Sequence, residues 1–384
     1  MDGPTPFTIA VPEARLEQIR DGLRAASISY APQGSGWEYG VDVAYLRELV
    51  DYWIEGYDWR RWEAHLNRFP QSSVRIDDVD VRFQHITGSG GRGPILLTHG
   101  WPGSILEFDA AAERLAFPEK FGGRAEEGFD LVIPSLPGFG FSTRPVRPIG
   151  PRKVSAMWRT LMVERLGYAR FYLQGGDFGS SVSSWIAHDA PEHVGGLHLN
   201  LCIPMPVSAS EAVPGEVEWR AAYEAVQRRA SAYMHEHMTK PQTIGAALSA
   251  SPVAFAAWVI EKFHAWADTR GDIESRFSKD HLITNLMTYL VNDAVTSAIW
   301  MYAGTAAEAG QGLLSGLKVT VPTGVALFPA EFIPAAPEAA MARNWNLQRL
   351  TRMPAGGHFA AFEEPERFAD DVREFFLGLE LRNS

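Results

Sequence analysis

The chain has 384 residues, of which 46% are hydrophobic and 21% are charged. These fractions are close to the globular average and exclude a disordered or fibrous chain, while the length fits several domains or one large domain with an insertion. The 46 acidic and 35 basic residues give a formal charge of −11, which disfavours nucleic acid or an anionic membrane as a partner. The single cysteine, Cys202, can form neither an internal disulfide nor a cysteine zinc site.

The sequence shows no targeting pattern. Its N-terminus lacks a basic segment followed by an apolar one. The longest clearly apolar run, Pro252 to Ile260, is far shorter than the ~20 residues that a membrane span needs. We therefore expect a soluble, cytoplasmic protein without a membrane partner.

The first 70 residues are predicted to be helical and aromatic. Apolar residues recur there at helical spacing, which predicts two amphipathic helices that pack on the rest of the chain. The first stripe contains Leu16, Ile19 and Leu23, and the second contains Leu46, Leu49, Val50 and Trp53.

After residue 70 the pattern changes to short apolar runs that end in glycine-rich turns. Two strands are predicted around a turn at Asp77-Asp78, and five more at 95–98, 131–133, 171–174, 325–328 and 347–352. Helical stretches such as 156–166 lie between them. Strands that alternate with helices predict a mostly parallel sheet covered by helices, which is an α/β fold.

Residues 205 to 316 are predicted to be almost wholly helical, with helices at 217–233, 252–268 and 280–302. The simplest organisation is one α/β domain with a helical cap inserted into it. We assign residues 1–90 to an N-terminal meander with the first strands, 91–204 and 318–384 to the two parts of the core, and 205–317 to the cap.

The string GGDFG at 175–179 directly follows a predicted strand. It has the pattern of a nucleophile elbow, with Asp177 in the position that serine occupies in many hydrolases. Alone, this string fits a solvated glycine-rich turn equally well.

The residues that follow favour catalysis. In such hydrolases the nucleophile is followed along the chain by an acid and then by a histidine. Glu331 and His358 occur in this order after Asp177, each in a loop just after a predicted strand. Glu338 is a rival for the acid, although it lies further from its strand.

A fourth element is the string HGWP at 99–102, again after a strand. A turn there can direct the backbone N–H of Trp101 into the site, where it would form an oxyanion hole with the N–H of Phe178. The Trp101–Pro102 peptide bond is a candidate for the cis form.

Several strings together closely resemble the epoxide hydrolases of the microsomal type. They are HGWPGS at 99–104, PSLPGFGFS at 134–142, GGD at 175–177, GGHFAAFE at 356–363, NRFPQ at 67–71 and TKPQTIG at 239–245. The resemblance spans nearly the whole chain. It implies an α/β-hydrolase fold with an N-terminal meander, and it places Tyr233 and Tyr302 at the positions of the two acid tyrosines, with Tyr223 and Tyr289 as rivals.

The resemblance implies that Asp177 opens an epoxide to give an alkyl-enzyme ester, which water activated by His358 hydrolyses to a vicinal diol. Substrate and water are then the only small-molecule partners, and neither a cofactor nor a metal is implied. The aromatic cap favours an apolar epoxide, aryl-bearing ones included. The chain departs from many members in having Phe178 rather than Trp after the nucleophile, and it lacks their membrane-anchoring helix.

Two other functions stay open. A haloalkane dehalogenase also uses an aspartate on this fold, and a non-catalytic ligand-binding protein could share the scaffold. A homodimer is compatible with the sequence, but no motif supports it. The closely spaced pair His235 and His237 does not lie on one helical face and is not predicted to bind metal. The alternating charges of Glu363, Glu364, Glu366 and Arg367 are predicted to lie on a solvated helix face.

Overall fold

A computed structural model describes residues 3–205, 207–208, 210–308 and 316–383. Its described part is built around a nine-stranded sheet with the order β1-β2-β3-β5-β4-β6-β7-β8-β9. The strands are β1 Thr5–Phe7, β2 Gln71–Ile76, β3 Val79–Ile86, β4 Arg92–Thr98, β5 Phe129–Pro134, β6 Phe171–Gly175, β7 Val194–Leu199, β8 Val319–Leu327 and β9 Trp345–Arg352.

The predicted parallel sheet is confirmed from β5 to β9, where each pair of neighbours is parallel. At the other edge, β1, β2 and β3 pair antiparallel, so the sheet is mixed. Strands β2 and β3 form a hairpin at the predicted turn, where Asp77 has a φ of 53°. A short polar side chain such as aspartate tolerates this left-handed conformation better than most residues.

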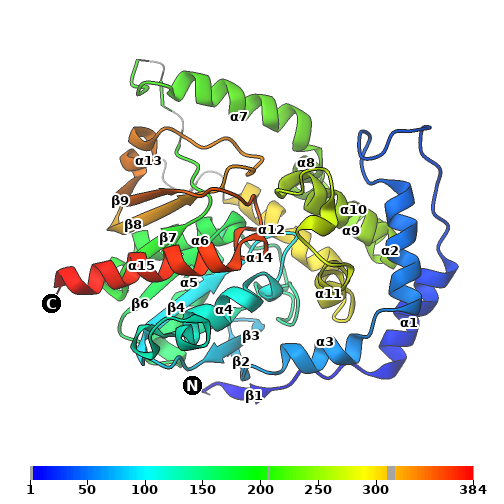
Figure 1. The fold of residues 1–384 in the computed structure, drawn as a ribbon, viewed down its shortest axis with the longest axis horizontal. Helices are drawn as coiled ribbons and strands as arrows, with labels where there is room; N and C mark the ends of the chain where they lie inside the picture. The colour runs from blue at the N-terminus through cyan, green and yellow to red at the C-terminus, as the bar shows by residue number, and fades with distance from the viewer. Residues whose placement is uncertain (1–2, 206, 209, 309–315, 384) are drawn as a thin grey trace.

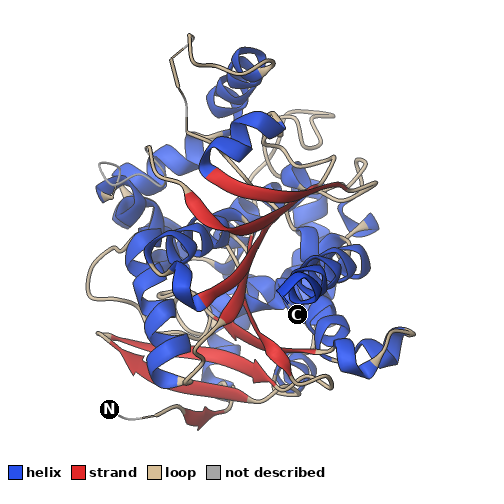
Figure 2. Cartoon of the chain, turned by 90° about the vertical axis from the view of Figure 1, so that its left-hand side faces the viewer, coloured by secondary structure: helices blue, strands red, loops and turns tan. Residues whose placement is uncertain are grey.

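Helices cover both faces of the sheet (Figure 2). Helices α4 (Asp109–Ala116) and α15 (Pro365–Asn383) pack against each other, and α5 (Pro151–Arg159) packs against α6 (Asp177–Asp189). The helix predicted at 156–166 begins earlier than expected, at Pro151, and continues from α5 through a wider π turn at 160–165. Proline favours this start because it needs no hydrogen-bond acceptor in the first turn.

The N-terminal helices α1 (Glu13–Ala25), α2 (Val43–Glu55) and α3 (Trp59–Leu66) lie beside the cap (Figure 1). Both predicted apolar stripes are buried. The hydroxyl of Tyr52 donates to Asp280 over 2.8 Å, and that of Tyr57 lies 3.0 Å from the hydroxyl of Thr284. This segment therefore packs on the cap helices, as expected for a segment with too few apolar residues to form a core of its own.

The cap lies between β7 and β8 and contains α7 to α12. These helices are α7 Glu216–Ala230, α8 Ala232–Thr239, α9 Pro241–Ser249, α10 Pro252–Trp266, α11 Lys279–Leu290 and α12 Val295–Ala307. Two short helices, α13 Glu338–Asn344 and α14 Ala360–Glu363, follow β8 and β9. The helix predicted at 252–268 is confirmed, with Ser251 as its N-cap.

Two predicted helices, at 217–233 and 280–302, are each wrong as single helices. The first is interrupted at Ser231, whose φ and ψ of −100° and 7° are not helical and whose hydroxyl bonds to the Gln227 carbonyl. The second is interrupted at Asp293, which has a φ of 52°. Arg15 binds both the Asp293 carboxylate and the carbonyl at Leu290, so a distant segment stabilises this break.

The registers of the parallel strands bring their carboxyl ends together at one edge. Thr98 pairs with Gly175, Gly175 pairs with Leu199, and Leu327 pairs with Arg352. The loops that follow β4, β6, β8 and β9 contain the nucleophile, acid, histidine and oxyanion-hole residues that the sequence predicts. They therefore lie side by side at the edge where α/β proteins bind their ligands.

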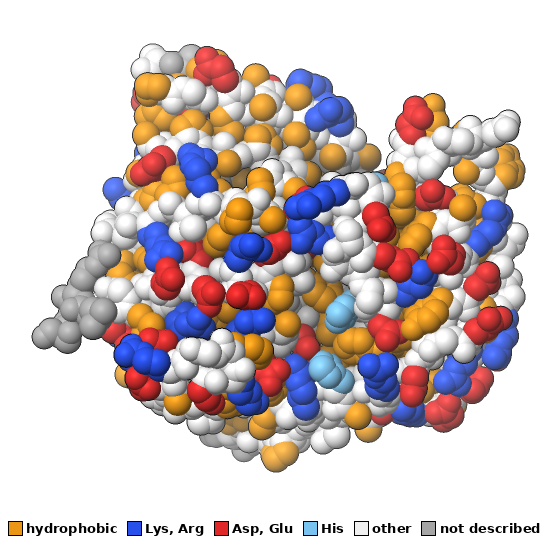
Figure 3. All heavy atoms as spheres, in the orientation of Figure 1, with side chains coloured by type: hydrophobic (Ala, Val, Ile, Leu, Met, Phe, Trp, Pro, Cys, Tyr) orange, Lys and Arg blue, Asp and Glu red, His pale blue; other side chains and the backbone are white. Residues whose placement is uncertain are grey.

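Within the described ranges, no single helix is long and apolar enough to cross a membrane, although α9 and α10 meet that test as a pair bent by 116°. Acidic and basic side chains are interspersed over the face drawn in Figure 3.

Candidate active site

Asp177 lies at a sharp turn between β6 and α6. Its φ is +47°, a left-handed conformation that is uncommon for residues other than glycine. A Cβ on Gly175 would lie 2.2 Å from the Gly179 carbonyl oxygen, and a Cβ on Gly179 would lie 1.8 Å from that of Thr98. The glycines thus let the turn pass close to its neighbours, and the strand–turn–helix context expected of a nucleophile elbow is confirmed.

The two carboxylate oxygens of Asp177 have different surroundings. Oδ1 accepts a hydrogen bond from the backbone N–H of Trp101 at 2.9 Å. Oδ2 lies 3.4 Å from Nε2 of His358. The carboxylate is therefore oriented through one oxygen, while the other faces the histidine.

His358 is held by Glu331 on its far side. Nδ1 of the imidazole lies 2.9 and 3.1 Å from the two carboxylate oxygens of Glu331, and both side chains are buried. Burial by itself lowers the pKa of His358, but the carboxylates of Glu331 and Asp177 hold it well above its ordinary value. Glu338, the rival acid, is exposed in the first turn of α13.

The turn that contains Trp101 is fixed by the cap. The Asn285 side chain, on α11, donates to the Pro102 carbonyl over 2.8 Å and lies 2.9 Å from the Ser104 hydroxyl. The hydroxyl of Tyr289 donates to the Gly103 carbonyl. The Trp101–Pro102 bond is cis, as expected. The hydroxyl of Tyr289 thus bonds to the turn that contains Trp101.

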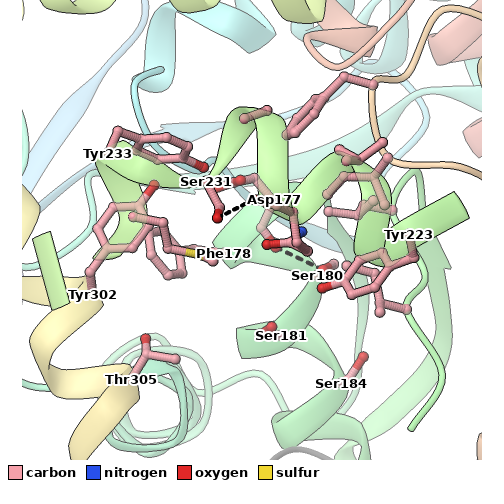
Figure 4. Close-up of a pocket in the computed structure, with 18 of the residues that line it drawn as sticks. Asp177, Phe178, Ser180, Ser181, Ser184, Tyr223, Ser231, Tyr233, Tyr302 and Thr305 are labelled. Atoms are coloured by element: carbon pink, nitrogen blue, oxygen red, sulfur yellow. Dashed lines mark hydrogen bonds between the residues drawn. The ribbon is translucent and has the colours of Figure 1, made fainter. Parts of the chain in front are cut away.

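Tyr233 on α8 and Tyr302 on α12 are brought together over Asp177. Their ring centroids are 5.8 Å apart at 87°, and the Trp101 indole stacks on Tyr233 at 5.3 Å. Burial raises the pKa of both hydroxyls well above the ordinary value, so both phenols stay protonated at neutral pH. Figure 4 draws them on the same side of Asp177, with Tyr223 on the opposite side.

Asp177, Tyr233 and Tyr302 share one cavity of about 270 Å³. Most of its wall is apolar, and the apolar lining includes Phe178, Leu201, Ile203, Val226, Phe332 and Ile333. Serine side chains and Gln227 add hydrogen-bonding groups to its wall. The ring of Phe178 packs edge-on against Tyr302 at 4.8 Å.

The predicted solvated face is wrong for Glu363 and Glu364, which are buried, and confirmed for Glu366 and Arg367, which are exposed. Glu363 accepts backbone N–H bonds from Gly357 and Phe359, each at 2.9 Å, and from Asp268 at 2.7 Å. It thereby holds both residues that flank His358. The sequence did not predict this role of Glu363, because its charged neighbours favoured an exposed helix face. Its position in the turn directly after the histidine loop was the one signal for such a role.

The histidines in the cap and core do not gather into a metal site. Among the described residues, no three His, Cys, Asp or Glu side chains lie together as metal ligands. His237 instead accepts a hydrogen bond from the Trp258 indole at 3.1 Å, and burial lowers its pKa to about 3. His99 accepts from the Leu136 N–H at 3.2 Å, and burial lowers its pKa to about 4, which fits a neutral histidine supporting the turn.

Comparison with known proteins gives the family of the chain. A family model described as "Epoxide hydrolase N terminus" matches residues 4–108, and one described as "alpha/beta hydrolase fold" matches residues 93–274. Epoxide hydrolase 1 of Sus scrofa is 34% identical over an alignment that covers 97% of this chain and 88% of that protein. The chain belongs to the epoxide hydrolase family.

Solved structures agree with this assignment. The juvenile hormone epoxide hydrolase of the silkworm Bombyx mori superimposes with a TM-score of 0.90 at 28% identity, covering 100% of this chain and 96% of that one. The epoxide hydrolase of Aspergillus niger gives a TM-score of 0.85 at 29% identity, covering 98% and 97%. The predicted fold and the resemblance to the microsomal type are confirmed, and the chain is an epoxide hydrolase.

Proposed function

We propose that this epoxide hydrolase works through an alkyl-enzyme ester on Asp177. The observation that carries the proposal is the position of one carboxylate between three groups: the Trp101 N–H, His358 and the pair of buried tyrosines. A carboxylate can displace at a saturated carbon and open a strained epoxide, forming an ester. Oδ2 is the attacking atom, because Oδ1 is held by the backbone.

Tyr233 and Tyr302 would stabilise the oxygen that leaves the attacked carbon. Both hydroxyls are protonated at neutral pH and line the cavity beside Asp177. They can therefore donate hydrogen bonds to the epoxide oxygen and supply the proton that it needs when the ring opens.

His358 would then activate water for hydrolysis of the ester. Alkylation removes the charge of Asp177, which is one of the contributions that raise the pKa of His358 in the free enzyme. The imidazole therefore becomes easier to deprotonate once the ester has formed. Glu331 orients the ring. The N–H groups of Trp101 and Phe178 donate hydrogen bonds to the developing oxyanion, and each donor stabilises it by about 3 kcal/mol.

The cavity supports an apolar substrate of moderate size. Its volume of about 270 Å³ and its mostly apolar wall favour an alkyl or aryl epoxide, since apolar groups gain free energy when they leave water. Haloalkane dehalogenation is a second activity to test, because the indole N–H of buried Trp101 has no hydrogen-bond partner among the residues the structure describes and is a candidate donor to halide. Diol formation and halide release distinguish the two.

Trapping the ester tests the mechanism. We expect His358→Gln to react once with styrene oxide and to gain the mass of the substrate on a peptide containing Asp177, whereas wild type turns over. In H₂¹⁸O, wild type should incorporate label into Asp177 during turnover. An Asp177→Asn variant that forms diol at the wild-type rate would contradict the proposal.

A further inference from the structure

Glu107 is a half-buried acid that lies close to the site and has no part in the mechanism above. It belongs to a 3₁₀ turn, Ile105–Phe108, directly after the turn that contains Trp101. A Cβ on residue 103 would lie 1.3 Å from its carboxylate oxygen Oε1. Gly103 therefore leaves the space that the Glu107 carboxyl group occupies.

Glu107 faces a small cavity that is distinct from the epoxide cavity. The small cavity has a volume of about 10 Å³, and its wall includes Glu107, Trp101, Asp177 and His358. This volume suits about one water molecule, which needs several polar partners in order to be retained. The wall supplies them in the Glu107 carboxyl group, the Asp177 carboxylate and the imidazole of His358.

The imidazole of His358 is incompletely satisfied by the protein. Among the described residues, Nε2 has no hydrogen-bond partner, although the side chain is only 3% exposed. Its separation of 3.4 Å from Asp177 Oδ2 is too long and poorly directed for a good hydrogen bond. Buried polar atoms are nearly always paired with protein or water, so this nitrogen points to a bound water in the small cavity.

We propose that Glu107 is a positioning residue that holds the hydrolytic water between its carboxyl group and Nε2 of His358. The proposal rests on the ester mechanism above and adds the origin of the water. The epoxide enters from the large cavity, whereas the water waits in the small one. The water is thus next to the Asp177 carboxyl carbon before the ester forms.

The reaction that this arrangement serves is balanced. One proton of the water moves to Nε2 of His358 while its oxygen attacks the carboxyl carbon of the Asp177 ester. When the tetrahedral intermediate collapses, the bond between that carbon and the alkoxy oxygen breaks. The diol oxygen takes the proton from His358, and Asp177 returns as a carboxylate that contains the oxygen of the water.

The electrostatics of Glu107 are consistent with this role. Burial raises its pKa to about 8, the charge of His358 opposes this, and the charges of Asp177 and Glu363 add to it. Strongly perturbed pKa values cluster at functional sites, and the Glu107 carboxyl group lies in the same cavity wall as the histidine of the site.

Two substitutions test the proposal. In Glu107→Gln the side-chain oxygen is kept, and in Glu107→Leu both polar atoms are removed. Rapid-quench experiments with styrene oxide would follow ester formation and ester hydrolysis separately. We expect alkylation within about twofold of wild type in both variants, and hydrolysis slowed about tenfold or more in Glu107→Leu with a smaller loss in Glu107→Gln, so that the ester accumulates.

Stability distinguishes positioning from a structural role. Replacement of an incompletely paired buried carboxyl group by leucine should leave Tm unchanged or raise it. Glu113→Gln on α4, which makes the same Glu-to-Gln change in a partly exposed pair with Lys120, is the matched control for Glu107→Gln and should hydrolyse the ester as wild type does. Equal slowing of both steps with a lower Tm would overturn the proposal, as would unchanged hydrolysis in Glu107→Leu. A wild-type enzyme that forms no ester would instead overturn the proposed function itself.

Discussion

The backbone N–H of Trp101 donates a hydrogen bond to Oδ1 of Asp177 over 2.9 Å. This bond crosses from the loop after β4 to the turn after β6, whose strand ends are paired at Thr98 and Gly175. The same N–H that orients the carboxylate before attack is available to the oxyanion during hydrolysis. One backbone group therefore connects both halves of the proposed reaction.

This contact makes Gly100 a sensitive position. A Cβ there would lie 2.2 Å from Asp177 Oδ1, so Gly100→Ala must displace the carboxylate or the turn. We expect kcat to fall about 100-fold or more while the protein stays folded, because small displacements of reacting groups are costly. Steady-state assays and a thermal melt would measure this.

Gly378→Ala on α15 is the control for that substitution. A Cβ there would meet nothing within 4 Å, so activity should be unchanged and the helix slightly more stable, by up to about 1 kcal/mol. Wild-type kcat in Gly100→Ala would show that the position of the Asp177 carboxylate against the Trp101 turn does not govern the rate.

The two buried tyrosines should affect the first half-reaction. Tyr233→Phe and Tyr302→Phe each remove one donor to the epoxide oxygen, so we expect alkylation to slow about tenfold or more in each variant. Hydrolysis of an ester that has already formed should change less. Single-turnover measurements with an aryl epoxide separate these steps.

Substitutions of two further tyrosines are the controls for that prediction. Tyr30→Phe removes a hydroxyl from a side chain that is 92% exposed and should have no effect. Tyr223→Phe alters the other side of the cavity and should change KM more than the alkylation rate. If Tyr223→Phe slows alkylation and Tyr302→Phe does not, the acid is assigned to the wrong residue.

The sequence predicted most of the fold and the principal site for a physical reason. Apolar periodicity reports which side of an element is buried, and the glycine-rich string at 175–179 reports a turn that only small residues can form. Asp177, Glu331 and His358 each follow a strand, and parallel strands align their ends. Order along the chain was therefore enough to place these residues together.

The errors arose where distant contacts decide local structure. The helix break at Asp293 depends on Arg15, and no local pattern reports that contact. Glu107 was missed because its role depends on Gly103 leaving space for its carboxyl group, which is visible only in three dimensions. Acidic residues near glycines and histidines can thus be buried when backbone N–H groups donate hydrogen bonds to their carboxylates.

Glu363 offers a test of that last point. Glu363→Gln replaces one accepting oxygen by an NH₂ group, so at least one of the three hydrogen bonds from backbone N–H groups around His358 is lost and an NH₂ group faces an N–H. We therefore expect the free energy of unfolding to fall by about 2–3 kcal/mol, with lower kcat as well. Urea denaturation and steady-state assays would measure both. Glu366→Gln, whose side chain is 70% exposed, should change neither. Equal stability of the two variants would mean that Glu363 does not anchor the histidine loop.

The charge of Asp177 should control the protonation of His358. Its carboxylate and that of Glu331 raise the pKa of the imidazole against the opposite effect of burial, because negative charges stabilise the imidazolium ion. Asp177→Asn removes one of these charges, as alkylation does, so the pKa of His358 should fall. Imidazole resonances followed by NMR over a pH titration would report the change. Asp189→Asn, which removes a carboxylate 2.8 Å from His188, is the control and should leave the pKa of His358 unaffected. If the pKa of His358 stayed constant or rose in Asp177→Asn, ester formation could not be what converts the imidazole into a base.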